Sequence, residues 1–227
     1  MSDTTLTWPT RPLLLSCCLI AAPLAETIEQ ALSPLTGGST PDDLAAIAAR
    51  PERFLLSVLI GLIGTALLLP ALLGLAGLGS DRSPKLSLLA SIAIGTSSLG
   101  FAGVRMAQAF ELQLATGGLP PAQAADQFDA AVGSPIGLAL TIAFLGGTVI
   151  GVVLLAITLW RSHRVPIGAV ILLVLFPVID LALPTHPGPV ISHLVLLGSM
   201  GWMAITLLRT DLRTSMPSAP ELGRVTR

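Results

Sequence analysis

The longest charge-free stretch of this chain is AAVGSPIGLALTIAFLGGTVIGVVLLAITLW, residues 130–160, and it decides the fold class. Its polar residues are all uncharged. An α-helix rises 1.5 Å per residue, so about 20 mainly apolar residues cross the roughly 30 Å of hydrocarbon in a bilayer. The stretch therefore predicts a membrane-spanning helix at about 135–160.

Four further apolar stretches have the same character, and they predict spans at about 54–79, 86–110, 165–184 and 187–208. The N-terminal apolar run lies between Arg11 and Glu26 and is shorter, which leaves a signal-peptide core as an alternative. It reaches spanning length if the helix continues to Leu32, with Glu26 and Glu29 at the lipid headgroups. We therefore predict an all-α polytopic bundle of six transmembrane helices, the first at about 12–32.

The composition places the chain in the membrane class as well. Of its 227 residues, 52% are hydrophobic and 11% are charged, against about 25% charged in soluble domains. The net charge is −1 and the basic residues are scattered, which argues against a nucleic-acid partner. The only cysteines, Cys17 and Cys18, are neighbours, so no disulfide framework is expected. We predict one transmembrane domain, residues 1–209, without a metal site or cofactor.

The basic residues predict the orientation, because short basic loops resist translocation across the membrane. With six spans and a cytoplasmic N-terminus, the outside loops contain only Arg50 and Arg53 among the basic residues. Both termini are then cytoplasmic, and residues 210–227 form a mobile cytoplasmic tail. Two outside loops carry proline-initiated, alanine-rich segments that predict short helices at about 41–50 and 121–131.

Three ionisable residues fall inside the predicted spans, where such groups are costly and usually have a role. Counted along their helices, Arg105, Asp180 and His193 lie in one layer of the outer leaflet, with Glu111 nearer the surface. We expect Arg105 to pair with Asp180 and His193 to be their hydrogen-bond partner. Pro177 removes a backbone N–H close to Asp180, as in the interrupted helices of many transporters. We favour a structural bridge for these residues, and a substrate or proton site is the alternative.

Enzymatic interpretations find less support. A Ser97–His193 dyad on different helices would resemble that of intramembrane serine proteases, yet the other residues of that family are not apparent. We therefore predict no catalytic residues and an integral membrane protein that is an accessory, regulatory or interaction partner. The alternative is a small-solute or proton-coupled carrier that uses the Arg/Asp/His layer. The expected partners are the lipid bilayer and other membrane proteins or further copies of the chain.

Three segments carry a resemblance: LWRSHRVP at 159–166, TPDDL at 40–44 with the later Arg53-Phe54, and LLLPALLGLA at 67–76. With them the chain resembles small, uncharacterised polytopic membrane proteins of actinobacteria, a family of the domain-of-unknown-function type. The resemblance implies a six-helix bundle in the cytoplasmic (inner) membrane of a bacterium. It implies no reaction and no site residues.

Overall fold

The computed structural model describes residues 12–35 and 37–215, and within them the chain forms eight α-helices and no strand. The predicted all-α class is confirmed. The helices are α1 (Pro12–Leu32), α2 (Thr40–Ala49), α3 (Pro51–Leu78), α4 (Pro84–Thr116), α5 (Pro121–Val132), α6 (Pro135–Ser162), α7 (Ile167–Ala182) and α8 (Gly188–Ser215). Most of them have a proline at or next to their first residue, where its missing N–H costs nothing.

Five of the described helices are long and apolar enough to cross a membrane: α1, α3, α4, α6 and α8. The chain is thus a multi-span helical membrane protein. The uncertain N-terminal segment reaches this length because α1 continues through Glu26 and Glu29 to Leu32. The helix in the predicted fifth span, α7, is apolar but has only 16 residues.

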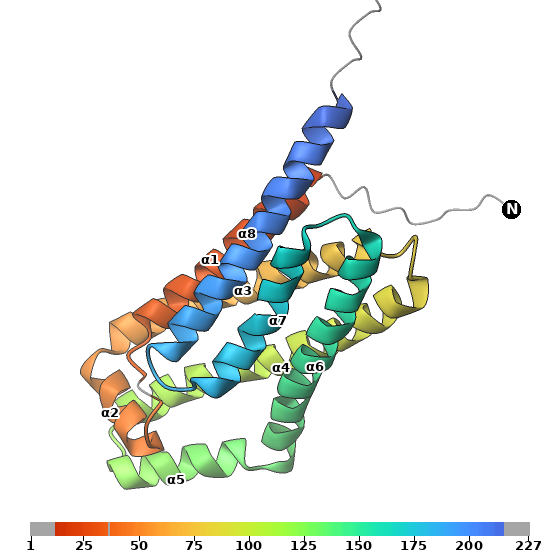
Figure 1. The fold of residues 1–227 in the computed structure, drawn as a ribbon. Helices are drawn as coiled ribbons and strands as arrows, with labels where there is room; N and C mark the ends of the chain where they lie inside the picture. Colours follow the sequence, from red (N-terminus) through yellow and green to blue (C-terminus); the bar gives the residue numbers. More distant parts are fainter. Residues whose placement is uncertain (1–11, 36, 216–227) are drawn as a thin grey trace, which may run out of the picture.

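Six helices form a closed ring, in which each contacts the next in the order α1, α3, α4, α6, α7, α8 and back to α1 (Figure 1). We refer to these six helices as the ring. Sequential ring helices run antiparallel, because short turns join α3 to α4, α6 to α7 and α7 to α8. Helices α2 and α5 lie across one end of the ring, in the two loops where the sequence predicts short helices.

The pairing of α4 with α6 depends on small residues. A Cβ atom added to Gly147 would lie 2.7 Å from the backbone nitrogen of Ser97, so only glycine permits this approach. The Ser97 and Thr148 hydroxyls lie 2.7 Å apart across the same interface, and Phe101 stacks on Phe144 with ring centroids 5.0 Å apart. The two helices therefore form a tightly joined pair.

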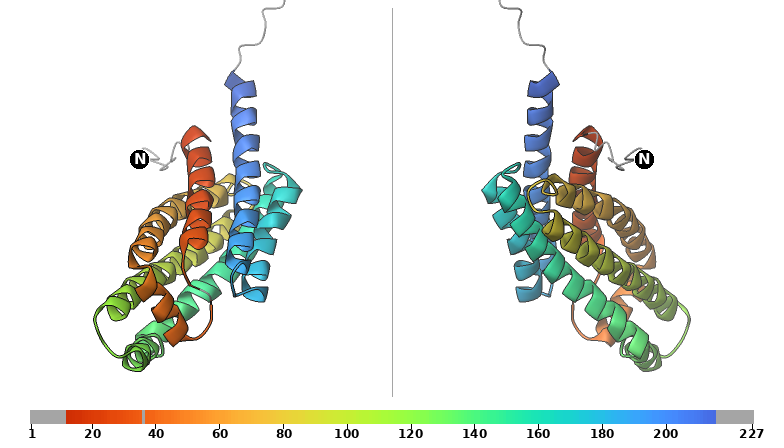
Figure 2. Two further views of the ribbon diagram at one scale, coloured as in Figure 1. Left: turned by 90° about the vertical axis from the view of Figure 1, so that its left-hand side faces the viewer. Right: turned by 90° about the vertical axis from the view of Figure 1, so that its right-hand side faces the viewer.

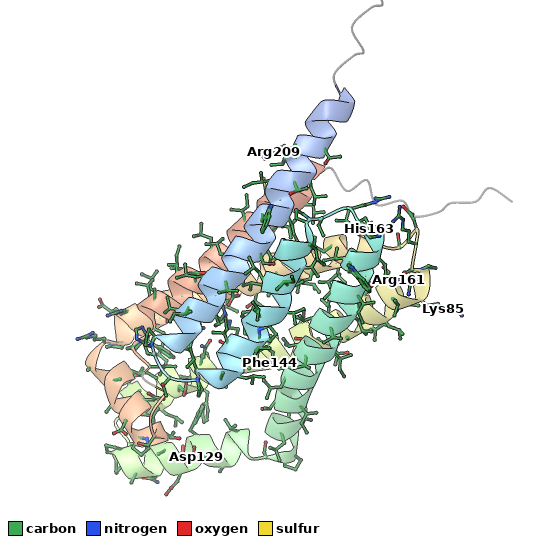
Figure 3. All side chains as sticks on the ribbon, in the orientation of Figure 1. Lys85, Asp129, Phe144, Arg161, His163 and Arg209 are labelled. Carbon is green, nitrogen blue, oxygen red and sulfur yellow. The ribbon has the colours of Figure 1, made fainter. Side chains whose placement is uncertain are left out.

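The two ends of the ring differ in charge. At one end, the turns between α3 and α4 and between α6 and α7 are joined by an Arg164–Asp81 ion pair of 2.6 Å and a hydrogen bond from Arg82 to the Arg161 carbonyl. Figure 3 shows Lys85, Arg161, His163 and Arg209 toward this end and Asp129, on α5, at the other. We call these the basic end and the α2/α5 end.

Large apolar side chains cover the outside of the ring, as expected of a surface in contact with lipid. Leu99, Met106, Ile136 and Ile142 are at least 70% exposed, a degree of apolar exposure that a water-soluble domain avoids. The largest buried apolar cluster lies inside the ring and includes Leu19, Leu75, Leu155, Leu173 and Met200.

The C-terminal helix is longer than the sequence suggests. Helix α8 continues to Ser215, so it includes the first six residues, 210–215, of the segment predicted to be a mobile tail. Its end projects past the other helices (Figure 2). No proline or glycine occurs between Gly201 and Pro217, so nothing in this part of the sequence breaks the helix. The rest of the predicted tail, 216–227, lies outside the described residues, as do residues 1–11.

Candidate functional site

A buried ion-pair network joins three helices of the ring. Arg105 on α4 forms salt bridges with Glu26 and Glu29, which lie one turn apart on α1. The Nη2–Oε2 distance to Glu26 is 2.6 Å, and the Nη1–Oε1 distance to Glu29 is 2.5 Å. Arg105 is 3% exposed and each glutamate 1%. Since single buried charges are costly, these groups compensate one another.

Every N–H of the Arg105 guanidinium has an acceptor. Nε donates to the Thr65 hydroxyl at 3.2 Å, and Nη1 donates to Glu29 and to Oε1 of Gln108. Nη2 donates to Oε2 of Glu26 and to Oε2 of Glu29. A guanidinium has five N–H groups, so the network uses all of them. The guanidinium also lies 4.5 Å from the centre of the Phe101 ring, within cation–π range.

Two glycines of α3 make room for this network. A Cβ atom at Gly61 would lie 2.6 Å from Cζ of Arg105, and one at Gly64 would lie 2.6 Å from Oε1 of Glu26. The two positions are three residues apart and therefore share one face of the helix. The small-residue face of α3 thus admits charged side chains from both of its neighbours.

The expected pairing of Arg105 with Asp180 is wrong, because Arg105 pairs with Glu26 and Glu29, which are buried inside the protein. The apolar run of α1 ends before Glu26, and for this reason its length alone predicts that both glutamates lie at the surface. In the structure α1 packs on α3, and its two glutamates reach past α3 to Arg105 on α4. The spacing of Glu26 and Glu29, which puts them on one helix face opposite Gly61 and Gly64, is the signal that could have revealed this.

Asp180 and His193 belong to a second polar group, between α7 and α8. Oδ1 of Asp180 accepts a hydrogen bond of 2.6 Å from the Ser192 hydroxyl. Nδ1 of His193 lies 2.7 Å from the Pro189 carbonyl oxygen, and its ring meets the Phe176 ring edge-on. Within the described part of the chain, Asp180 forms no ion pair. Instead of the predicted partnership with an Arg105–Asp180 pair, His193 contacts Pro189 and Ser192 in its own helix and Phe176 on α7.

One cavity connects the two polar groups. It has a volume of about 430 Å³ and lies inside the ring, and Arg105, Asp180 and His193 all contribute to its wall. Most of the lining is apolar or aromatic, with Phe101, Phe144 and Phe176 among the lining residues, and Ser97 and Ser98 add hydroxyls. Such a volume, apolar lining and small set of polar groups are typical of a small-molecule site. The three residues of the predicted layer thus share a cavity although they do not pair.

Glu111, the fourth predicted site residue, lies nearer the α2/α5 end on α4. Its side chain is half-buried, and it is not among the residues that line the cavity. The structure therefore separates Glu111 from the other three. The cavity wall instead contains Glu26, Gln30 and Gln108. None of these three was predicted as a site residue from the sequence.

The described residues include no group of three or more His, Cys, Asp or Glu side chains arranged to hold a metal ion. The Ser97 hydroxyl is bonded to Thr148 and the His193 ring to Pro189. No hydrogen bond joins Ser97 to His193, so the two do not form the dyad that an intramembrane serine protease would need.

Comparison of the chain with protein-family models, curated proteins and solved structures gives no match.

Proposed function

We propose that this membrane protein is a carrier without enzymatic activity, which binds a small molecule in the cavity inside the ring. The observation that supports this most is the position of Asp180, whose carboxyl group lies in the cavity wall within the membrane and forms no ion pair with any described residue. An ionisable group without a counter-charge is costly inside a bilayer. A bound solute or proton would supply the compensation that the protein does not.

The surroundings of Asp180 favour transport over a fixed structural role. Pro177, one turn earlier on α7, also lines the cavity, and proline removes one backbone hydrogen bond from its helix. Helices weakened in this way next to an ionisable group are common in transporters. The contact of α7 with α6 is also less extensive than its contact with α8. We therefore expect α7 and α8 to move together against the α4–α6 pair.

For the membrane arrangement we propose six spans with both termini in the cytoplasm of a bacterium, in its inner membrane. The segregation of basic residues to the basic end supports this orientation, with Lys85 and Arg161 labelled there in Figure 3 and Arg82 and Arg164 joined to the same turns. Helix α7 would then be the fifth span in chain order, in addition to the five helices that are long enough by themselves. Its 16 residues reach about 24 Å at 1.5 Å per residue, and a turn at 185–188 leads directly into α8.

The alternative function, that of an accessory or interaction protein, requires no hydrated cavity. A measurement of whether water reaches the cavity therefore distinguishes a carrier from an accessory protein. We would replace Cys17 and Cys18 by alanine and introduce one cysteine at Ser98, which lines the cavity. The matched control is Leu99→Cys, the next residue along α4, which is 72% exposed on the outside of the ring. Thiols react as thiolates, which form in water and not in hydrocarbon.

For a carrier we expect N-ethylmaleimide to label Ser98→Cys quickly and Leu99→Cys slowly in proteoliposomes. Membrane-impermeant methanethiosulfonates, one cationic and one anionic, should reach Ser98→Cys from either side of the membrane in alternation. Equal, slow labelling of both cysteines would mean that the cavity is packed shut and would favour the accessory function. Access from one side alone would overturn transport and leave a binding protein.

A further inference from the structure

We infer that the solute is an organic cation with large apolar groups, a conclusion that rests on the proposed function and adds the class of substrate to it. The inference depends on how the charges in the cavity wall are already used. Arg105 is the single guanidinium in the described wall, and the cavity also contains the carboxyl groups of Glu26 and Asp180.

Arg105 has no hydrogen-bond donor left for an anionic solute. All five of its N–H groups are held by Glu26, Glu29, Thr65 and Gln108. An anion could bind only by displacing a glutamate, which would leave that carboxylate buried without its partner. The two glutamates also outnumber the one guanidinium they share. The residue that would ordinarily select an anion is thus neutralised by its own protein.

Asp180 has a free carboxylate oxygen. Oδ1 accepts the Ser192 hydroxyl, while Oδ2 accepts no hydrogen bond from the part of the chain that the structure describes. A carboxylate in an apolar cavity attracts a cation far more strongly than in water. A cationic centre close to Oδ2 would therefore bind where a neutral or anionic one would not.

The rest of the wall fits the apolar groups of such a molecule. Phe144 and Phe176 line the cavity together with the aliphatic side chains of Leu68, Leu72 and Leu196. Aromatic faces attract ammonium and phosphonium groups, and quaternary cations are recognised in this way because they have no hydrogen to donate. The combination of one free carboxylate with aromatic and aliphatic walls points to a lipophilic cation.

The experiment uses two ions of nearly the same size and shape and opposite charge, tetraphenylphosphonium and tetraphenylborate. Each is added to the full-length Ser98→Cys protein, without Cys17 and Cys18, in lipid nanodiscs, and the rate of N-ethylmaleimide labelling is measured. We expect tetraphenylphosphonium to slow labelling and tetraphenylborate to leave it unchanged, although the anion partitions well into membranes.

The test of the residue is Asp180→Asn, which should weaken protection by tetraphenylphosphonium by about 30-fold or more, as when one partner of a buried charge pair is removed. Asp180→Glu keeps the charge and should retain part of the protection. Asp126→Asn is the matched control, because Asp126 is an exposed acid at the α2/α5 end and does not line the cavity; it should leave protection unchanged.

The outcomes separate the two proposals. If Ser98→Cys is never labelled, the cavity is closed and the proposed function itself fails. If it is labelled but tetraphenylborate protects the cysteine as well as tetraphenylphosphonium does, the cation inference alone is overturned. The same holds if tetraphenylphosphonium protects the cysteine in the Asp180→Asn variant as well as in the parent protein. Should Asp180→Asn fail to fold, the comparison of the two ions in the parent protein and in Asp180→Glu still decides.

Discussion

Arg105 holds Glu29 through two parallel hydrogen bonds, Nη1 to Oε1 at 2.5 Å and Nη2 to Oε2 at 2.9 Å, across the interior of the ring. This two-pronged arrangement is the strongest geometry between a guanidinium and a carboxylate. It joins α1 to α4, two helices that are separated in the ring by α3. The pair therefore connects the ring across its interior, where apolar packing alone would not specify one arrangement.

Removal of the arginine should be the most damaging single change in the protein. Arg105→Leu leaves two carboxylates buried without a counter-charge, which typically costs about 3–5 kcal/mol. We expect a large loss of folded, monodisperse protein in detergent, measured by size-exclusion chromatography and thermal unfolding. The triple variant Arg105→Leu, Glu26→Gln, Glu29→Gln should recover much of the loss, because it removes all three charges together.

The control for this prediction is Arg164→Leu at the basic end. Arg164 and Asp81 also form a salt bridge, but their side chains are 51% and 70% exposed, and exposed pairs contribute about 0–1 kcal/mol. If Arg105→Leu were no more destabilising than Arg164→Leu, the network would have no structural role.

The close approach of α4 and α6 predicts a sharp difference between two neighbouring glycines. A Cβ atom at Gly147 would lie within 3 Å of backbone atoms of α4, whereas one at Gly146 would meet nothing within 4 Å. Gly147→Ala should therefore destabilise the protein by about 1–3 kcal/mol through overpacking, while Gly146→Ala should be neutral. Thermal unfolding in one detergent measures both, and equal midpoints would show that the helices are not this close.

Arg53 provides a prediction at the α2/α5 end. Its Nε and Nη2 atoms donate to the carbonyl oxygens of Leu32 and Ala31, which lie at the end of α1 without helical partners. Arg53→Ala should lower stability by about 0.5–1 kcal/mol, as for a lost cation at a helix C-terminus. Arg50→Ala is the control, because Arg50 makes no such contact. A similar loss in the two variants would argue against the cap.

The proposed orientation predicts the labelling of two exposed sites. In the background without Cys17 and Cys18, a cysteine at Gln123, on α5, should react with an impermeant maleimide added outside intact cells. A cysteine at Ser80, in the turn at the basic end, should react only after the membrane is opened, because short basic loops remain cytoplasmic. The reverse pattern would invert the topology.

The helices could be predicted from the sequence wherever many consecutive residues share one property, such as the absence of charge or a high alanine content. The long span at 135–160 and the short helices at 41–50 and 121–131 follow from charge-free length and from proline-initiated, alanine-rich loops. Helix α1 ends at Leu32, as predicted, whereas the end of α8 was harder to predict. Helix α8 continues to Ser215 through a polar segment, because no Pro or Gly near residue 210 breaks it.

For the candidate site, the positions of residues along each helix could be predicted, whereas the contacts between helices could not. The sequence by itself predicted that Arg105, Asp180 and His193 lie at a similar level of their apolar helices, because that level depends only on position along a helix. Only the tertiary structure decided their partners, since pairing depends on which helices are neighbours in the ring and how they are rotated. Arg105 meets Glu26 and Glu29 because Gly61 and Gly64 leave room for side chains from α4 and α1 to meet against α3. That contact uses up the guanidinium and leaves the Asp180 carboxylate in the cavity without a protein cation.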